Sequence, residues 1–161
     1  MCTAGSPIKF SVNDETRASL FFQSPEICNL THTQSEGFSS LSNGIHNTPA
    51  GLTIHRSKIV RINYCEFSNN RLGDDILNIF DCKNFIIENS YFHDVLSDAF
   101  DSDFSNGVVR NNRFEEIGND GVDGSGSDMD IHHNEFTNIH DKAISCGERS
   151  AFRALKNTIR N

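Results

Sequence analysis

The chain has 161 residues, of which 36% are hydrophobic and 22% are charged, and its formal net charge is −8. This length and composition suffice for one domain with its own hydrophobic core. The acidic balance argues against binding to nucleic acid, whose phosphates require patches of Lys and Arg. No apolar run is long enough to cross a bilayer, and the first residues lack the layout of a signal peptide.

Residues 1–50 contain three segments with the composition of short β-strands. The first is an edge strand around Ile8 to Val12, and the others are "LFFQ" from Leu20 and "ICNLTHTQS" from Ile27. Residues 36–49 are rich in Ser, Asn, Gly and His, so we expect an inserted loop there between two coils. This first part is irregular, whereas residues 51–161 follow a regular repeat.

Two strand-like segments recur in residues 51–161 with matching spacing. The first segments begin at Leu52, Leu77, Phe100, Val122 and Ile144, which lie 22 to 25 residues apart. The second segments end at Phe67, Phe92, Phe114, Phe136 and Ile159, with the same spacing. This pattern is typical of a solenoid, in which each coil buries its apolar face only by stacking on its neighbours.

The coils are built from strands, because Ile, Val, Phe and Tyr recur in short runs between clusters of Asn, Gly, Asp and Ser. No window shows a sustained helical period of apolar residues. A leucine-rich repeat is the competing solenoid, but its Leu-x-x-Leu-x-Leu frame is absent. The sequence therefore predicts an all-β parallel β-helix of about six coils, two strands to a coil, as one domain over residues 1–161.

The last coil ends at "NTIRN" without a capping segment, although a terminal repeat normally needs one to cover its sheet edge. We expect either a longer solenoid of which this chain is a part or a homo-oligomer in which a second copy covers the open coil. The five cysteines form no CxxC pair. We therefore expect small buried side chains rather than a zinc site or a disulfide framework.

Alternation along the first strand of each coil separates inward from outward side chains. One inward row is Leu20, Leu52, Leu77, Phe100, Val122, Ile144. The other inward row, two residues further on, is Phe22, Ile54, Ile79, Ser102, Gly124, Cys146. Two rows are expected to face solvent. The first is Phe21, Thr53, Asn78, Asp101, Asp123, Ser145. The second is Gln23, His55, Phe80, Asp103, Ser125, Gly147. A turn file of Asp75, Asp98, Asp120 and Asp141 precedes the strand.

These rows stack carboxylates on one another. Parallel strands lie about 4.8 Å apart, so we expect the side chains of Asp101 and Asp123 within about 5 to 6 Å, with Asp103 beside them. Such a stack destabilises a sheet unless a cation binds, a proton is shared, or water and turn hydrogen bonds solvate the oxygens. A calcium ion would take Asp98, Asp101, Asp120 and Asp123 as ligands. A shared proton would make Asp101, Asp103 and Asp123 an acid and base set.

Other candidate residues lie around this face or away from it. His55 is expected beside the acidic residues on the outer face. His132 and His133 are adjacent, so their side chains are expected on opposite sides of a strand and in no common site. A further outward file is formed by Glu66, Tyr91, Arg113 and Glu135. Its alternating charges predict an ion ladder of small energetic value.

Residues 50–160 resemble the right-handed parallel β-helix superfamily of pectin lyases, polygalacturonases and other polysaccharide lyases and epimerases. The runs "SDAFDSDF", "GNDGVDGSGS" and "DKAISCGE" further resemble β-helix regions of bacterial surface or secreted proteins, some of them associated with spore-coat-H-like kinase domains. The resemblance implies carbohydrate chemistry on an exposed sheet and an extracellular or cell-surface location.

The resemblance is incomplete at the catalytic motifs. Only "NDGVD" at residues 119–123 is similar to the Asn-Thr-Asp of polygalacturonases, and their Asp-Asp and Gly-His-Gly are absent. Lyases of this fold imply a Lys or Arg base beside calcium carboxylates, for which only Lys142 and Arg149 stand near enough. The fold alone does not establish a function.

Two functions therefore remain open. The first is a polysaccharide-processing enzyme of the glycoside hydrolase or lyase type, in which Asp101, Asp123 and Asp103 are catalytic. Its substrate would be held by His55, Asn78, Asp98, Asp120, Ser125, Ser145 and Lys142. The second is a non-catalytic module for glycan binding or for spacing at a cell surface. Because the face carries almost no Lys or Arg, an enzyme on it is expected to act on neutral sugars.

Overall fold

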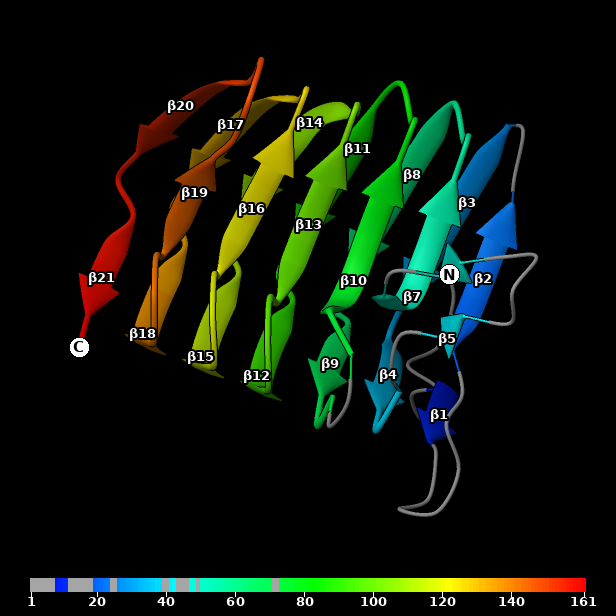
Figure 1. Ribbon diagram of the computed structural model, residues 1–161, viewed down its shortest axis with the longest axis horizontal. Coiled ribbons are helices and arrows are strands. Elements are labelled where there is room, and N and C mark those ends of the chain that lie inside the picture. The colour runs from blue at the N-terminus through cyan, green and yellow to red at the C-terminus, as the bar shows by residue number, and fades with distance from the viewer. Residues whose placement is uncertain are drawn as a thin grey trace, which may run out of the picture.

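A computed structural model describes residues 8–11, 19–23, 26–38, 41–42, 47–48, 50–70 and 73–161. In this part the chain winds into an all-β solenoid whose coils stack side by side along one axis (Figure 1). Three parallel sheets run along the solenoid, and neighbouring strands in each sheet come from successive coils. The prediction of a parallel β-helix is confirmed.

The front sheet faces the viewer in Figure 1. It contains β2 (Leu20–Gln23), β7 (Ala50–His55), β10 (Asp75–Phe80), β13 (Phe100–Asp103), β16 (Val122–Ser125) and β19 (Ile144–Cys146). The back sheet contains β3 (Ile27–Thr31), β8 (Ile59–Asn63), β11 (Phe85–Glu88), β14 (Asn106–Arg110), β17 (Asp128–His132) and β20 (Ala151–Leu155).

The side sheet joins the back sheet to the front sheet of the next coil. It contains β1 (Ile8–Ser11), β4 (Thr33–Glu36), β9 (Glu66–Ser68), β12 (Tyr91–Val95), β15 (Arg113–Ile117), β18 (Glu135–Ile139) and β21 (Thr158–Arg160). β1 is the predicted edge strand. The short antiparallel pair β5 (Leu41–Ser42) and β6 (Asn47–Thr48) lies within the predicted insertion at residues 36–49.

Each regular coil has three strands, so the prediction of two was wrong. The second predicted segment bends in its middle, for example at Tyr64, whose φ of 54° separates β8 from β9. Asn89, Asn111 and His133 bend the following coils in the same way, with φ of 51°, 55° and 58°. One residue in the left-handed region turns the chain sharply, and Asn and His enter that region more readily than most residues.

The predicted register is confirmed in both series of strands. Leu20 is the cross-strand partner of Leu52, and Ser35 is the partner of Phe67. The second series places Phe67, Phe92, Phe114 and Phe136 in one buried stack, with successive ring centroids 4.8, 4.9 and 4.8 Å apart. Stacked rings of this size exclude water from the interior over several coils.

The inward rows of the front sheet are buried along most of the solenoid. Leu52, Leu77, Phe100 and Val122 belong to the core, but Ile144 in the last coil is half-buried. Cys146 was expected to point inward and is exposed, because no described strand stacks beyond β19. Cys28, Cys65 and Cys82 are buried free thiols, as expected.

Side-chain ladders occupy the three corners of the coil. Between the back and side sheets, the backbone N–H of Asn112 donates to Asn134 Oδ1 and that of Asn134 donates to Asn157 Oδ1, both at 2.9 Å. A ladder of Ser57, Cys82, Ser105, Ser127 and Ser150 joins the front and back sheets in the same way. These bonds satisfy corner N–H groups that no strand can reach, which stabilises each sharp turn.

The stack of phenylalanines predicts the response to one truncation. Phe114→Ala leaves a cavity between Phe92 and Phe136, so we expect the free energy of unfolding to fall by about 3 to 5 kcal/mol. Urea denaturation measures the change. The exposed Leu96→Ala is the control, with an expected change below about 1 kcal/mol. Equal effects of the two substitutions would contradict the central role of the stack.

Candidate functional site

The outer face of the front sheet carries an aromatic strip formed by Phe21, His55, Phe80 and Phe104. Neighbouring ring centroids along the strip are 6.1, 5.2 and 5.8 Å apart. Phe21 and Phe104 are exposed, and His55 and Phe80 are half-buried. The strip follows the solenoid axis from β2 to the end of β13, so flat apolar surfaces line one side of the sheet.

Thr53 and Asn78 also point to this outer side, but they are buried at 2% and 0% exposure, where the sequence predicted exposed side chains. The chain after β4 also lies on this side of the sheet, where buried Phe38 packs against Gly51 of β7. A Cβ on Gly51 would come within 2.9 Å of the Phe38 Cβ, so only glycine leaves space for this contact. Three buried atoms here have no hydrogen-bond partner, namely Thr53 Oγ1, His55 Nε2 and Asn78 Oδ1.

Asn78 holds two carboxylates of the next coil together. Its Nδ2 donates to Asp101 Oδ2 and to Asp103 Oδ2, both at 3.1 Å. Burial raises the pKa of Asp101 to about 7, and the negative charges of Asp103 and Asp123 act in the same direction. A hydrogen bond with Asp103 raises the pKa of Asp101 further. Asp101 therefore holds a proton more tightly than an ordinary Asp does.

Asp123 lies opposite Asp101 in the predicted register, in the next coil. Its Oδ1 accepts the backbone N–H of Gly124 at 2.8 Å, which fixes the orientation of the carboxylate. Ser125 is the cross-strand partner of Asp103, and Ser145 is the partner of Asp123. We call Asp101, Asp103 and Asp123 the acidic patch. Around it the fold brings together Asn78, Ser125 and Ser145, as predicted for the outward rows.

The turn file is largely part of a corner ladder. Asp98 Oδ1 accepts the N–H of Asp120, and Asp120 Oδ1 accepts the N–H of Lys142, at 2.7 and 2.9 Å. Lys142 therefore takes the place predicted for Asp141, because it follows Asp120 by 22 residues, as Asp120 follows Asp98, whereas Asp141 follows Asp120 by 21. The Lys142 ammonium lies 3.5 Å from Asp120 Oδ1 and also bonds Asp141. Lys142 and Asp120 are thus paired with each other in the corner.

One acidic group at the same corner was not predicted. Carboxylate oxygens of Asp74, Asp75 and Asp98 lie within 4.8 Å of one another, and no other such group occurs in the described ranges. Of the predicted calcium ligands Asp98, Asp101, Asp120 and Asp123, only Asp98 belongs to it. Burial raises the pKa of Asp75 to about 10, with further contributions from neighbouring carboxylates, first Asp101. The adjacent acids in "GDD" at 73–75 are the signal that could have identified the group.

The side sheet carries the predicted file of Glu66, Tyr91, Arg113 and Glu135, in register from coil to coil. Arg113 lies over the Tyr91 ring at 5.0 Å, and the Tyr91 hydroxyl donates to Glu115. Burial and that carboxylate raise the pKa of Tyr91 to about 12. Pairs of this kind on an exposed sheet stabilise it modestly, so the file is part of the scaffold.

His132 and His133 lie together, where the sequence predicted opposite sides. Their Nδ1 atoms are 2.9 Å apart, because the positive φ of His133 turns its side chain around the corner. Burial, followed by the nearby charge of His133, lowers the pKa of His132. The pair lies at the end of the back sheet and does not join the acidic patch.

The raised pKa of Asp101 predicts a dependence of stability on pH. Since an unfolded Asp titrates near 3.9, the native state binds more protons between about pH 4 and 7. The Asp101 contribution to stability therefore falls as pH rises through this window. Asp101→Asn removes it, and we expect the variant to be more stable than the parent by on the order of 2 kcal/mol at pH 8, with little difference at pH 4.

Urea denaturation at both pH values measures this difference. Asp128→Asn is the control, because Asp128 is an exposed carboxylate on the back sheet. A stability difference for Asp101→Asn that is the same at pH 4 and pH 8 would contradict the raised pKa.

Comparisons with known proteins bear on the fold. Residues 24–161 match the family model described as "Right handed beta helix region". No curated protein matches the chain, and no solved structure matches it. No helix in the described ranges is long and apolar enough to span a membrane. The match covers most of the sequence and agrees with the stacked parallel sheets, so the chain belongs to the right-handed β-helix family.

Proposed function

We propose that this protein processes a neutral polysaccharide as a glycoside hydrolase, on the outer face of the front sheet. The observation that carries the proposal is that one Asn78 amide holds Asp101 and Asp103 together and that the pKa of Asp101 is raised to about 7. A carboxyl group that keeps its proton near neutral pH is suited to general acid catalysis.

The acidic patch contains both groups that glycoside hydrolysis requires. Protonated Asp101 donates its proton to the glycosidic oxygen as the bond to the leaving sugar breaks. The carboxylate of Asp123, opposite in the next coil, is the nucleophile and bonds the anomeric carbon as the leaving sugar departs. Asp101, now a carboxylate, then takes a proton from the water that releases the sugar from Asp123. Asp103 and Asn78 hold Asp101 in place, and the half-buried setting strengthens these electrostatic effects.

The surroundings of the acidic patch favour a neutral sugar chain. Exposed aromatic rings present flat apolar surfaces, while carboxylates and hydroxyls beside them accept or donate hydrogen bonds at the edge of a ligand. The carboxylates of Asp103 and Asp123 are the main charges acting on Asp101, and no described Lys or Arg forms an ion pair with it. An anionic polyuronate would meet uncompensated negative charge there, which disfavours the lyase reaction on such substrates. The proposal implies an extracellular or cell-surface setting, where polysaccharides occur.

A second candidate function is glycan binding without catalysis. The aromatic strip alone favours it, because four neighbouring rings along the solenoid could hold a sugar chain with no reaction. In that case the acidic patch serves only as polar surface beside the strip.

A panel of neutral and acidic glycans, assayed for new reducing ends and for unsaturated products, tests the proposal. We expect reducing ends from a neutral glycan, and a loss of at least about 100-fold in kcat for Asp101→Asn and for Asp123→Asn. Asp128→Asn should keep full activity. Activity should also fall as pH rises above about 7, because Asp101 then loses the proton that it donates.

The same panel separates the two candidate functions. One outcome is that no glycan gives a product, while a glycan binds and its affinity falls several-fold in Phe80→Ala. That outcome would establish glycan binding without catalysis and exclude the hydrolase. Unsaturated products from an acidic glycan would instead establish a lyase, against the proposal.

A further inference from the structure

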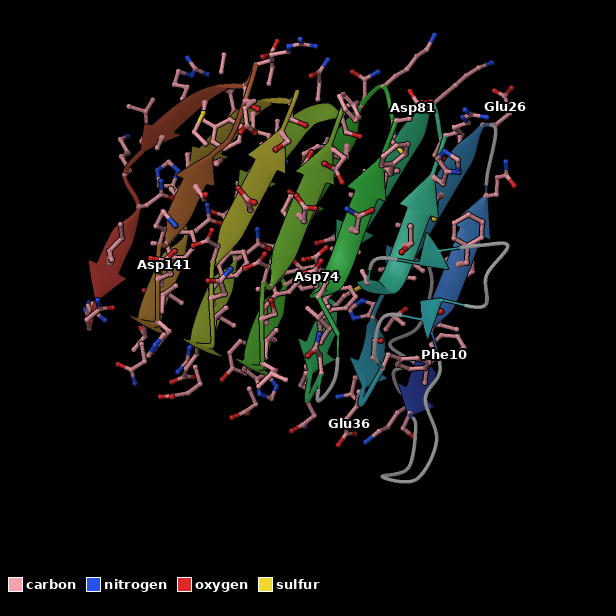
Figure 2. The ribbon with its side chains drawn as sticks, in the orientation of Figure 1. Phe10, Glu26, Glu36, Asp74, Asp81 and Asp141 are labelled. Atoms are coloured by element: carbon pink, nitrogen blue, oxygen red, sulfur yellow. The ribbon has the colours of Figure 1, made fainter. Side chains whose placement is uncertain are left out.

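The corner where the side sheet passes into the front sheet contains a compact group of oxygen atoms. Carboxylate oxygens of Asp74, Asp75 and Asp98 lie within 4.8 Å of one another. Asp74 lies in the corner between β9 and β10, Asp75 begins β10, and Asp98 lies in the same corner one coil later. Figure 2 shows Asp74 at the edge where the front strands begin, the edge near which Asp141 lies further along the solenoid.

Two of these carboxylates are removed from water, since Asp75 is 3% exposed and Asp98 is 8% exposed. Asp98 Oδ1 is fixed by the Asn119 amide and by the N–H of Asp120, both at 2.7 Å. Neither Asp75 nor Asp98 takes part in an ion pair with a described Lys or Arg. Burying like charges side by side is unfavourable unless a positive charge compensates them.

A second observation points to a ligand at this corner. Asn70 is 2% exposed, and its Nδ2 donates to the backbone carbonyl of Asp74 at 3.0 Å. The Oδ1 of the same amide group is buried and has no hydrogen-bond partner. Buried side-chain oxygens are rarely left without a partner. A side-chain amide oxygen is also a common ligand of calcium.

We propose that this corner binds a divalent cation of the calcium class, with the carboxylates of Asp74, Asp75 and Asp98 and the Oδ1 of Asn70 as its protein ligands. All of these ligands are oxygen atoms, and no Cys or His belongs to the group. A hard cation is therefore favoured over zinc. Calcium suits the site better than magnesium, which demands a near-ideal octahedron and usually keeps several waters.

The cation has a structural role, since it joins the corners of two successive coils. The backbone already links them, because the N–H of Leu96 donates to Asn70 O at 3.3 Å and that of Ile76 donates to Asp98 O at 3.0 Å. Binding to the native state alone shifts the folding equilibrium by a factor of 1+[L]/Kd, which is about 100 at a hundredfold excess over Kd. This inference stands apart from the proposed hydrolase, whose acid and second carboxylate are Asp101 and Asp123.

Melting temperature and calorimetric titration of the chelator-treated protein, with CaCl2, MgCl2 or NaCl added, test the proposal without any glycan. We expect CaCl2 to raise the Tm, MgCl2 to raise it less, and calorimetry to detect one calcium ion. Asp75→Asn should lose the shift. The matched control Asp128→Asn and the variant Asp101→Asn should both keep it. Where Asp75→Asn fails to fold, Asp74→Asn replaces it, because Asp74 is exposed.

Two results would overturn the cation site. One is the absence of both calorimetric binding and a calcium-dependent Tm shift at millimolar CaCl2. The other is a shift that survives in both Asp75→Asn and Asp74→Asn but disappears in Asp101→Asn, which would place the ion at the acidic patch. Neither result depends on whether the protein hydrolyses a glycan.

Discussion

Hydrogen bonding between coils is the constraint on which this structure depends. The three main strands of a regular coil pair with the coils before and after it and never with one another. In-register pairing then places equivalent residues on top of each other, from the phenylalanines of the side sheet to the aspartates of the front sheet. Stacking removes apolar surface from water but brings like charges together. Each stacked row of polar or charged side chains in this fold therefore needs hydrogen bonds or opposite charges that offset the cost of stacking.

The chain compensates its polar rows in different ways at different places. At the corners, each Asn or Asp oxygen accepts the N–H of a neighbouring coil, so a stacked polar group becomes a structural bond. On the front sheet no corner N–H is available, and an amide from the previous coil bridges Asp101 and Asp103 instead. The corner acids Asp98 and Asp120 thereby form structural bonds, whereas Asp101 and Asp103 of the acidic patch are held by a side-chain amide. That difference separates scaffold from candidate site.

The periodic part of the fold could be predicted because apolar stacking leaves a repeated signal in the sequence. The rows through Leu77 and Phe114 predict the register that the paired strands have. The third strand of each coil could not be found in this way, since the bend at Asn89 or His133 changes one φ angle and leaves the apolar spacing intact. The same bend brings His132 and His133 together, against simple alternation.

The candidate site was predicted in part, for a similar reason. Alternation shows on which side of a sheet a residue lies, and it correctly placed Asp101, Asp103 and Asn78 on one face. It does not show what covers that face, and here Phe38 folds over β7 from another part of the chain. Asn78 is fully buried on that face, and the amide it directs at Asp101 and Asp103 holds those two carboxylates together. The chemistry of the acidic patch thus depends on its covered neighbours as much as on its own carboxylates.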